Sequence, residues 1–453
     1  MYTVLLSGGS GKRLWPLSND IRSKQYLKLI RHEAEDRPCS MVQRVWAQLE
    51  RAGLENRMIC ASSGQCEILR SQLGRVSIVA EPNRRDTFPA VALACAYIKS
   101  ALGGEDGDAV CVIPVDPYTE ASYFEGIRRL ERVLAASGTD VALMGAAPDE
   151  PSVKYGYIVP GRQRDGYFEV ERFIEKPDRD LATKLIEQGA LWNCGVFCFR
   201  LGHVLGRLKR YGVPVDYDAL YDQYDRLPRV SFDYEVLEKA DRLAAVPFRG
   251  MWSDLGTWSA LSRQMRLPSL GNVHMSGCED TKVINELDLP VVALGAKNLM
   301  VVAAWDGILV ADQAAVDGIK DAVKDIKLKA MYEERRWGTI KTIDISENQE
   351  GFVLTRKVLM FGGQFSSYHF HRERDEAVTI LRGRGELQVE GVTTTIRQGT
   401  TITIPRSKRH GFRSFEDMEF LETHIGKSIG DEDINRLTFD WSRIPAIERE
   451  EGK

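Results

Sequence analysis

A short loop near the N-terminus combines glycine residues with positive charge. The loop reads Gly8-Gly9-Ser10-Gly11-Lys12-Arg13 and follows directly on a short apolar run, 3–6. Glycines let backbone N–H groups turn toward an anion and approach it closely, and the two cations add charge. The pattern therefore predicts a phosphate-binding loop after a buried strand.

Two common phosphate-binding patterns do not fit this loop. A P-loop requires Ser or Thr directly after its Lys, but Arg13 follows Lys12. The dinucleotide fingerprint requires a third glycine, and Leu14 stands in its place. The sequence supports neither a P-loop ATPase nor a simple NAD enzyme.

Five further motifs follow the loop in order. They are 24–27 (Lys-Gln-Tyr-Leu), 81–90 (Glu-Pro-Asn-Arg-Arg-Asp-Thr-Phe-Pro-Ala), 173–177 (Phe-Ile-Glu-Lys-Pro), 192–197 (Trp-Asn-Cys-Gly-Val-Phe) and 252–258 (Trp-Ser-Asp-Leu-Gly-Thr-Trp). Together with the loop, these motifs resemble the signature of sugar-1-phosphate nucleotidyltransferases, in the form used by mannose-1-phosphate guanylyltransferases. The resemblance extends over more than half of the chain.

The resemblance implies that a sugar 1-phosphate attacks the α-phosphorus of GTP and releases pyrophosphate. The attacking oxygen is already anionic near neutral pH, so neither a general base nor a covalent intermediate is required. The protein must neutralise charge and align the two reactants in line. A Mg²⁺ ion that bridges the phosphates is implied, and it requires carboxylate ligands.

The family motifs assign three sets of residues. The catalytic set is Arg13, Lys24, Asp116, Lys176 and Asp254, with Asp116 and Asp254 as Mg²⁺ ligands. The nucleotide-binding set is Leu6, Gly8, Gly9, Gly11, Arg13, Lys24 and Glu81. The sugar-binding set is Gly156, Glu175, Lys176 and Asn193.

Residue type alone favours simpler interpretations of the two aspartates. Asp116 stands before Pro117 and would be a turn residue, and Asp254 would be a helix N-cap. The resemblance favours metal binding instead. The segment Val115-Asp116-Pro117-Tyr118 replaces the commoner Ser-Asp-His pattern, so sugar or pyrophosphate contacts beside Asp116 are expected to differ. Gly156 is expected where a side chain would collide with the substrate.

Glu81 suggests which base is bound. It stands where related thymidylyl enzymes place a Gln. A carboxylate only accepts hydrogen bonds, and guanine offers N1–H and N2–H₂ as adjacent donors. Glu81 therefore favours GTP over triphosphates of adenine or pyrimidines.

The last quarter of the chain contains a second set of metal-binding residue types. His369, His371, Glu376 and His410, with Gly383 and the pair 404–405 between them, match the two motifs of a cupin. Three imidazoles and one carboxylate suit a divalent metal such as Zn²⁺. Glu373 or Asp375 could replace Glu376 as the carboxylate ligand.

The longer members of the family use this cupin as a phosphomannose isomerase. The isomerase motif Gln-x-His-x-His-Arg-x-Glu-His-Trp is altered here, because its Gln and Trp are absent and two extra residues precede the carboxylate. The segment Pro405-Arg406-Ser407 replaces Pro-x-Gly of that pattern, and Gly411 and Ser414 replace an Arg and an Asn. The sequence therefore predicts a metal-binding cupin and leaves its isomerase activity open.

The spacing of apolar residues predicts an α/β fold with a Rossmann-like nucleotidyltransferase domain and a mixed, mainly parallel sheet. Predicted strands are Thr3–Leu6, Met58–Ala61, Val76–Ala80, Ala109–Pro114 and Val141–Ala146, and predicted helices are Ser40–Ala52, Thr87–Leu102 and Tyr123–Ala136. Thr87 is expected to cap the second helix. In parallel sheets ligands bind beyond the carboxyl ends of the strands, which here are Ser7, Glu81 and Asp116.

The remaining chain divides into two β-rich parts. We expect the nucleotidyltransferase domain at 1–265, a small β-helix-like linker at 266–334 and a cupin β-barrel at 335–453. Within the linker, Pro290–Leu294, Leu299–Val302 and Gly307–Val310 read as strands and Ala314–Lys329 as a helix. Alternating runs in the cupin part are Val353–Phe361, Val378–Leu381, Gly385–Val389, Thr400–Ile404 and Phe420–His424.

Composition sets the expected compartment and partners. The 453-residue chain is 43% hydrophobic and 28% charged, with a net charge of −4, which argues against a nucleic-acid partner. No apolar run approaches the ~20 residues of a membrane span, and no signal peptide is evident. The eight cysteines form no Cys-x-x-Cys pair and mostly stand in apolar runs, as in a cytoplasmic protein. The oligomeric state is left open, with a homo-oligomer among the options.

Three functions remain in competition at this point. The first is a guanylyltransferase acting on mannose 1-phosphate, with or without isomerase activity in the cupin. The second keeps the chemistry but uses another hexose 1-phosphate. The third is a sensor that binds a nucleotide sugar without turnover, which would have no need for two metal-binding carboxylates.

Overall fold

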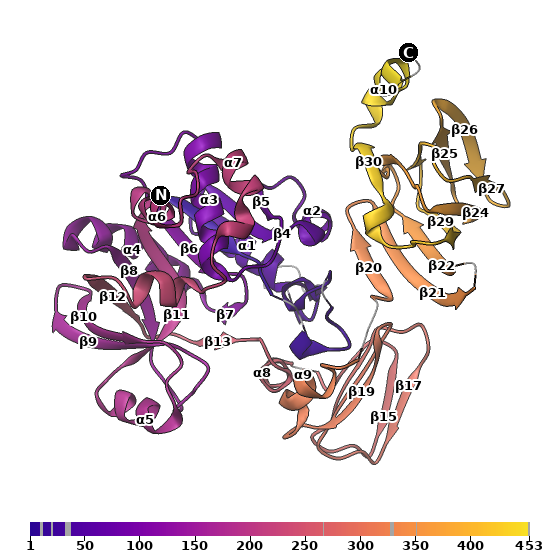
Figure 1. Ribbon diagram of the computed structural model, residues 1–453. Helices are drawn as coiled ribbons and strands as arrows, with labels where there is room; N and C mark the ends of the chain where they lie inside the picture. Colours follow the sequence, from indigo (N-terminus) through magenta and orange to yellow (C-terminus); the bar gives the residue numbers. More distant parts are fainter. Residues whose placement is uncertain are drawn as a thin grey trace.

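The computed structural model describes residues 1–9, 12–19, 21–31, 38–265, 267–326, 330–349 and 351–451. The predicted loop residue Gly11 lies outside these ranges. The chain forms a layered α/β part, a coil of short strands and a C-terminal β-barrel (Figure 1). The predicted fold class is confirmed.

A nine-stranded mixed sheet forms the centre of the α/β part. In sheet order its strands are β5 (Ile78–Glu81), β4 (Arg57–Ser62), β1 (Tyr2–Leu6), β6 (Ala109–Pro114), β11 (Leu191–Arg200), β8 (Val141–Ala146), β12 (Leu243–Phe248), β10 (Phe168–Ile174) and β9 (Tyr157–Gln163). The pairs β5–β4, β4–β1, β1–β6 and β8–β12 are parallel, and β11 is antiparallel to both of its neighbours β6 and β8. Because β5, β4, β1 and β6 run the same way, their carboxyl ends meet at one edge.

Helices cover both faces of this sheet. The helices of this part are α1 (Met41–Arg51), α2 (Cys66–Leu73), α3 (Thr87–Ala101), α4 (Ala121–Ser137), α5 (Arg179–Glu187), α6 (Leu201–Leu208), α7 (Tyr217–Asp222) and α8 (Trp258–Gln264), and α8 lies against residues 316–318 beside the coil of short strands. Short helical turns are η1 (Lys12–Leu14), η2 (Lys24–Tyr26), η3 (Ser63–Gln65), η4 (Lys209–Tyr211), η5 (Tyr224–Arg226) and the π-helix η6 (Asp233–Leu237). Two small ribbons complete the part: β7 (Pro117–Thr119) with β13 (Trp252–Asp254), and β2 (Ile30–Arg31) with β3 (Pro38–Cys39).

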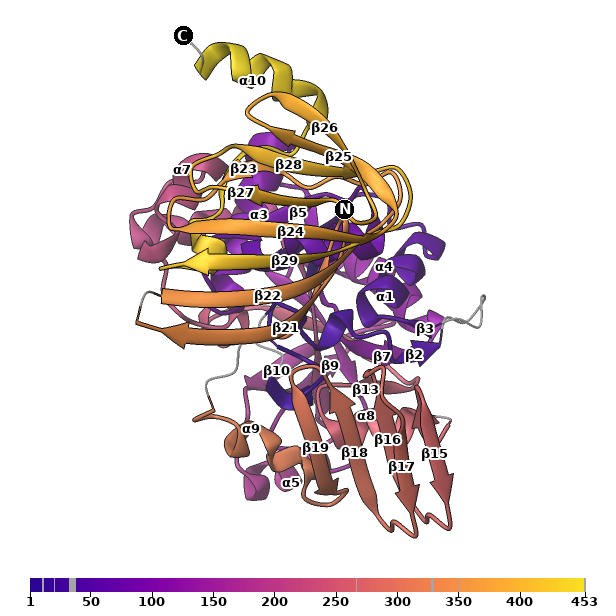
Figure 2. The same cartoon turned by 90° about the vertical axis from the view of Figure 1, so that its right-hand side faces the viewer.

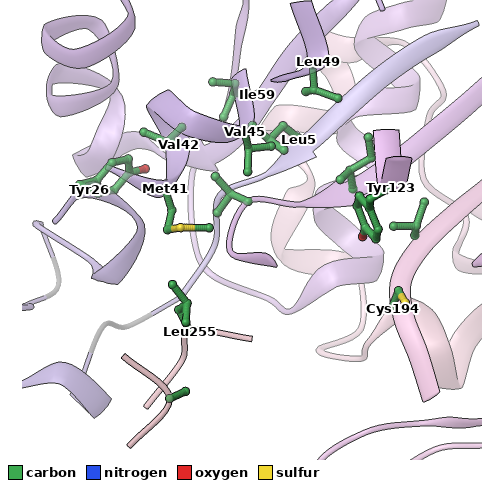
Figure 3. Packing of buried hydrophobic residues seen from close by; sticks show 14 of the residues in the cluster. Leu5, Tyr26, Met41, Val42, Val45, Leu49, Ile59, Tyr123, Cys194 and Leu255 are labelled. Atoms are coloured by element: carbon green, nitrogen blue, oxygen red, sulfur yellow. The ribbon is translucent and has the colours of Figure 1, made fainter. Parts of the chain in front are cut away.

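Alternation along the strands divides the hydrophobic core between the two faces. Leu5 of β1 packs with α1 and α4, whereas its neighbour Val4 packs with α3 and α6 on the opposite face. Figure 3 shows the first face, where Val42 and Val45 of α1 lie over Leu5 and Ile59. Because both faces of these strands are buried, successive side chains are apolar, which explains the continuous apolar runs in the sequence.

Helix caps agree with the predicted starts, with one correction. Ser40 caps α1 in a reciprocal capping box with Gln43. The cap of α3 is Asp86, whose carboxylate accepts from the backbone N–H of Thr87, so the prediction of Thr87 as the cap was wrong. The Thr87 side chain instead accepts a hydrogen bond from the backbone N–H of Phe232 at 2.8 Å.

The middle segment coils into two narrow sheets. One contains β14 (Ser269–Leu270), β16 (Lys282–Asn285), β18 (Leu299–Ala304) and β19 (Gly307–Asp312), and the other contains β15 (Val273–Ser276) and β17 (Val291–Leu294). All pairs except β18–β19 are parallel, as in a β-helix. The predicted helix Ala314–Lys329 is largely wrong, because the structure has only η7 (Val316–Gly318) and α9 (Ile319–Ala322) there, and residues 327–329 lie outside the described part.

The C-terminal part is a barrel of two antiparallel sheets. The six-stranded sheet contains β20 (Tyr332–Arg335), β21 (Gly338–Asn348), β22 (Gly351–Met360), β29 (Met418–Gly426), β24 (Arg374–Arg382) and β27 (Thr401–Ile404). The five-stranded sheet contains β26 (Val392–Arg397), β25 (Arg384–Val389), β28 (His410–Ser414), β23 (Tyr368–Phe370) and β30 (Asn435–Thr438). The chain ends with η8 (Asp431–Asp433), η9 (Trp441–Arg443) and α10 (Ile444–Glu451).

A buried ion-pair network joins the three parts. The Arg22 guanidinium donates to both Glu286 oxygens at 2.7 and 2.9 Å, and its Nε lies 3.4 Å from Glu334 of β20. Lys28 also pairs with Glu334, at 3.2 Å. Figure 2 shows the barrel strands above the coil of short strands, with the nine-stranded sheet behind both. Among the described residues no helix is both long and apolar enough to cross a membrane.

Candidate functional site

Two carboxylates and one ammonium group meet at the carboxyl edge of the parallel strands. The Lys24 ammonium forms an ion pair with Asp116 and a second one, at 3.3 Å, with Asp254. Asp116 follows β6, Lys24 begins η2, and Asp254 ends β13. Three predicted catalytic residues from distant segments are therefore brought together.

Backbone pairing positions this group. Strand β13 pairs with β7 so that Asp254 lies opposite Pro117, next to Asp116. Gln25, beside Lys24, donates from Nε2 to the carbonyl of Ser7 at 3.0 Å and fixes η2 at the end of β1. A Cβ atom on Gly256 would lie 2.9 Å from both Lys24 Nζ and Asp254 Oδ1, so a side chain there would displace one of these two groups.

The pKa values of the two carboxyls are shifted in opposite directions, although the Lys24 ammonium acts to lower both. Burial alone would raise the pKa of Asp116, but the charge and hydrogen bond of Lys24 outweigh it and lower the pKa. For Asp254 burial prevails, and the charge of Asp116 adds to it, so its pKa is raised. Arg13 contributes positive charge to both aspartates.

The described part of the glycine loop has room for an anion. Leu6 ends β1, and a Cβ atom added to Gly8 or Gly9 would meet no atom within 4 Å. Gly9 has a φ of +137°, and its carbonyl accepts from the Ser23 hydroxyl at 2.9 Å. The Arg13 side chain is exposed beside this space.

Glu81 ends β5 in a buried position. One of its carboxylate oxygens accepts a hydrogen bond from the hydroxyl of Tyr224, in η5, at 2.7 Å. Burial raises the pKa of Glu81, although that hydrogen bond opposes the shift. The contact with Tyr224 holds the carboxylate in a fixed orientation.

The predicted sugar-binding residues also converge. Lys176 Nζ lies 2.6 Å from Glu175 Oε1, and the backbone N–H of Asn193 donates to the carbonyl of Gly156 at 2.8 Å. A Cβ atom on Gly156 would lie 2.5 Å from Glu175 Oε2, so the structure supplies a reason for this glycine within the protein itself. Lys176 has a φ of +46°, a strained conformation that is frequent at functional sites.

Sequence reasoning missed two features of this region. Asp233 of η6 accepts from Asn193 Nδ2 at 2.8 Å, which places a further carboxyl beside Glu175. The rings of Tyr155, Trp192 and Trp252 pack together with centroid distances of 4.9 to 6.3 Å and join the segments that carry Gly156, Asn193 and Asp254. Neither Asp233 nor Tyr155 belongs to a motif whose spacing indicates chemistry.

The four predicted cupin ligands lie together inside the barrel. Glu376, which is 2% exposed, lies 2.8 Å from His371 Nε2 and 3.0 Å from His410 Nε2. The His369 ring lies 4.5 Å from that of His410. The alternative ligands are not part of the cluster, because Asp375 pairs with Arg406 at 2.7 Å and Glu373 is exposed.

Strand β29 adds two groups that the sequence motifs did not indicate. His424 Nε2 lies 3.2 Å from Glu376 and 3.1 Å from Glu422. His369, His371 and His410 form one group that could hold a metal ion, and Glu376, Glu422 and His424 form another. Only the alternation along β29 could have indicated that residues 422 and 424 face the same side.

The cluster fits a cation better than it fits a set of hydrogen bonds. His410 Nε2, Glu376 Oε2 and both ring nitrogens of His424 are buried, lie near charged neighbours and make no hydrogen bond of good geometry. Such atoms are costly to bury unless a metal or a partner satisfies them. A cavity of about 90 Å³ opens beside the cluster, and the guanidinium groups of Arg356 and Arg374 line it.

The fold, with Asp116 and Asp254 together at the edge of the sheet, indicates a class of enzymes that the comparison with known families names. The nucleotidyl transferase family matches residues 2–267, more than half of the chain, and the chain belongs to that family of enzymes. The cupin domain family matches residues 357–424.

Known proteins match this chain along nearly its whole length. Mannose-1-phosphate guanylyltransferase ManC of Salmonella typhimurium is 27% identical, with 98% of each chain covered. The alginate biosynthesis protein AlgA of Pseudomonas syringae pv. tomato is 28% identical, with 99% of this chain and 98% of the relative covered. A crystal structure from Thermus thermophilus, described as a mannose-1-phosphate geranyltransferase, is 29% identical, covers 72% of this chain and 99% of its own, and has a TM-score of 0.60. These names confirm the resemblance that the sequence motifs indicated.

Proposed function

We propose that this protein makes GDP-mannose and pyrophosphate from GTP and α-D-mannose 1-phosphate. The observation that carries the proposal is the convergence of Lys24, Asp116 and Asp254 beside an open glycine loop at the carboxyl edge of the sheet. The names of the full-length relatives support the choice of substrates.

In this proposal the cationic residues bind phosphate groups and the carboxylates bind the metal. Arg13 and Lys24 neutralise the triphosphate, and Lys176 binds the sugar phosphate as a point charge. Asp116 and Asp254 would hold a Mg²⁺ ion, which supplies positive charge where the reacting phosphates meet. The lowered pKa of Asp116 keeps one ligand ionised, and the Lys24 ammonium compensates the charge of the pair.

Recognition of the base is assigned to Glu81. Tyr224 occupies one carboxylate oxygen, and the other can accept from guanine N1–H and N2–H₂. Glu81→Gln should reduce the preference for GTP over ATP and UTP. An unchanged preference would remove Glu81 from the nucleotide site.

The decisive experiment measures pyrophosphate release across a matrix of four nucleoside triphosphates and several hexose 1-phosphates. The proposal expects turnover to be highest with GTP and mannose 1-phosphate. A maximum with another sugar would favour the second interpretation, a guanylyltransferase for a different hexose. Binding without release in every combination would favour a sensor.

The cupin is proposed to hold one divalent metal, with Zn²⁺ as an example, through His369, His371, Glu376 and His410. The buried, unsatisfied ring nitrogens and the Glu376 carboxylate support this assignment. Metal content of the intact protein should approach one equivalent and fall in His410→Gln. The exposed His274 provides a matched control, because His274→Gln should keep the metal.

Isomerase activity is the second candidate for the cupin. The cavity with Arg356 and Arg374 beside the cluster favours it, because guanidinium groups bind phosphate. The altered isomerase motif opposes it. We expect no interconversion of fructose 6-phosphate and mannose 6-phosphate by the full chain loaded with Zn²⁺, Co²⁺ or Mn²⁺. Measurable turnover would make the protein bifunctional.

We further propose the domain division 1–265, 266–334 and 335–453 and a cytoplasmic location. All eight cysteines are reduced thiols, and seven of them are buried, which suits a reducing compartment.

A further inference from the structure

A carboxyl group that no motif contains lies among the predicted sugar-binding residues. Asp233 begins the π-helix η6. Short π-helical turns are rare and occur frequently at functional sites. Phe232, the residue before it, is fully buried and stacks on Phe197 and Phe199 of β11 with centroid distances of 5.0 and 5.3 Å. This stacking fixes the start of η6 against the strand that carries Asn193.

The amide of Asn193 is oriented toward this carboxyl. Its Oδ1 accepts from the backbone N–H of Gly195 at 3.0 Å, and its Nδ2 donates to Asp233 at 2.8 Å. Asn193 therefore retains one amide hydrogen and one lone pair for another partner. Asp233, Asn193 and Glu175 present polar groups toward one region.

A purely structural role does not explain Asp233. Burial, and then the negative charge of Glu175, raise the pKa of Asp233 to about 7, against a weaker opposing effect of Lys176. In the described part of the chain Asp233 forms no ion pair. Carboxyl groups whose pKa is raised by burial and by a second carboxyl are concentrated at functional sites.

We propose that Asp233 determines which sugar the site accepts, by binding two neighbouring hydroxyl groups of the hexose together with Glu175 and Asn193. This inference rests on the proposed nucleotidyl transfer to a hexose 1-phosphate. Each hydroxyl donates to a carboxyl oxygen of Asp233 or Glu175, and the free amide hydrogen of Asn193 donates back to a hydroxyl oxygen. Such a site discriminates sugars that differ at one hydroxyl, because a missing partner leaves a buried polar group unsatisfied.

The test compares the intact parent protein with Asp233→Ala and Asp233→Asn. The matched control is Asp218→Asn, which changes an exposed aspartate in α7. Steady-state assays give separate KM values for GTP and mannose 1-phosphate, and the ratio of kcat/KM for mannose 1-phosphate to that for glucose 1-phosphate. Calorimetry of mannose 1-phosphate binding supplies a second readout that does not require turnover, and circular dichroism checks folding.

We expect Asp233→Ala to raise KM and Kd for mannose 1-phosphate at least about tenfold, while the KM for GTP changes less than about twofold. The preference between the two sugars should shrink, with a smaller effect in Asp233→Asn, whose amide oxygen can still accept from Asn193. A sugar KM and a sugar preference equal to those of the control would overturn the inference. Absence of nucleotide-sugar formation by the parent would instead overturn the proposed function.

Discussion

At the scale of single residues, one ammonium group shared by two acids is the centre of the proposed chemistry. Lys24 keeps Asp116 ionised and leaves Asp254 with a raised pKa, so the two acids are not equivalent. Because its pKa is raised, the ionised form of Asp254 depends more on a further nearby cation than that of Asp116 does. A divalent ion placed between the acids would lower its pKa again.

Removing the charge of Asp254 should therefore abolish most of the activity. We expect Asp254→Asn to lower kcat at least about 100-fold at saturating Mg²⁺ and GTP, because a metal contributes several kcal/mol to a phosphoryl transition state. Pyrophosphate release measures the effect. The exposed Asp149 provides the control, since Asp149→Asn should retain parental kcat. Parental activity in Asp254→Asn would rule out the proposed metal site.

The raised pKa of Asp233 has a consequence for stability. Its folded pKa of about 7 exceeds the unfolded value of about 3.9, so the folded protein binds more protons between these values. Its contribution to the free energy of unfolding is complete below pH 4 and is lost as the pH rises to 7. The loss is smaller than the shift suggests, because the side chain is only partly buried.

Asp233→Asn should remove this pH dependence. We expect the unfolding midpoint of the variant, relative to the parent, to rise between pH 5 and pH 8 in thermal scans without substrate. Parallel midpoint curves for the two proteins would show that Asp233 titrates normally.

Residues within motifs were predictable, and residues outside them were not. Lys24, Asp116 and Asp254 were identified because their neighbours in sequence match a family pattern. Asp233 and His424 belong to none of the motifs that the sequence analysis used. Their roles depend on which strand or helix packs beside them, and single-sequence spacing carries no such information.

At the scale of elements, the packing of the backbone around the site matters as much as the side chains. The loop between β13 and α8 passes so close to Asp116 and Asp254 that a methyl group on Gly256 would push aside Lys24 Nζ or the Asp254 carboxylate. We expect Gly256→Ala to displace Lys24 or Asp254 and to lower kcat at least about tenfold, with a small change in thermal stability. Gly206→Ala is the control, because Gly206 lies inside α6 with open space at its Cβ position.

The control substitution should stabilise the protein by up to about 1 kcal/mol, since alanine is the better helix former. Equal kcat values for the two variants would show that the close approach of Gly256 is unimportant.

Strands and long helices were predictable from apolar spacing, whereas short elements were not. The runs at 3–6 and 109–114 correspond to β1 and β6 almost residue for residue. The segment 314–329 has helical spacing, and Val316, Ile319 and Val323 are indeed buried. Gly318 interrupts the helix there, so the spacing indicated the correct buried face and the wrong element.

At the scale of the whole molecule, the contacts of Arg22 connect parts that the sequence presents as separate. This guanidinium is 6% exposed and reaches the coil through Glu286 and the barrel sheet through Glu334. Lys24 follows two residues later, so the same segment carries the connection and the ammonium group to which we assign a catalytic role.

Removing the Arg22 side chain should weaken the contacts between the three parts of the chain. We expect Arg22→Ala to destabilise the protein by about 3 kcal/mol, because Glu286 loses both hydrogen bonds from the guanidinium and the buried Glu334 keeps Lys28 as its remaining cation. Hydrogen exchange should then increase at η2 and β20 together. The exposed Arg179→Ala is the control. Exchange confined to η2 would show that β20 does not depend on the network.

The cavity inside the barrel is lined in part by a residue from outside the barrel. Glu67, in α2 of the α/β part, lines that cavity together with residues of the barrel. A truncated version that begins at the first barrel strand would thus present a differently shaped and less acidic entrance to any small molecule. Selectivity measured on such a fragment would describe an altered pocket, and ligand screens for the barrel need the undivided polypeptide.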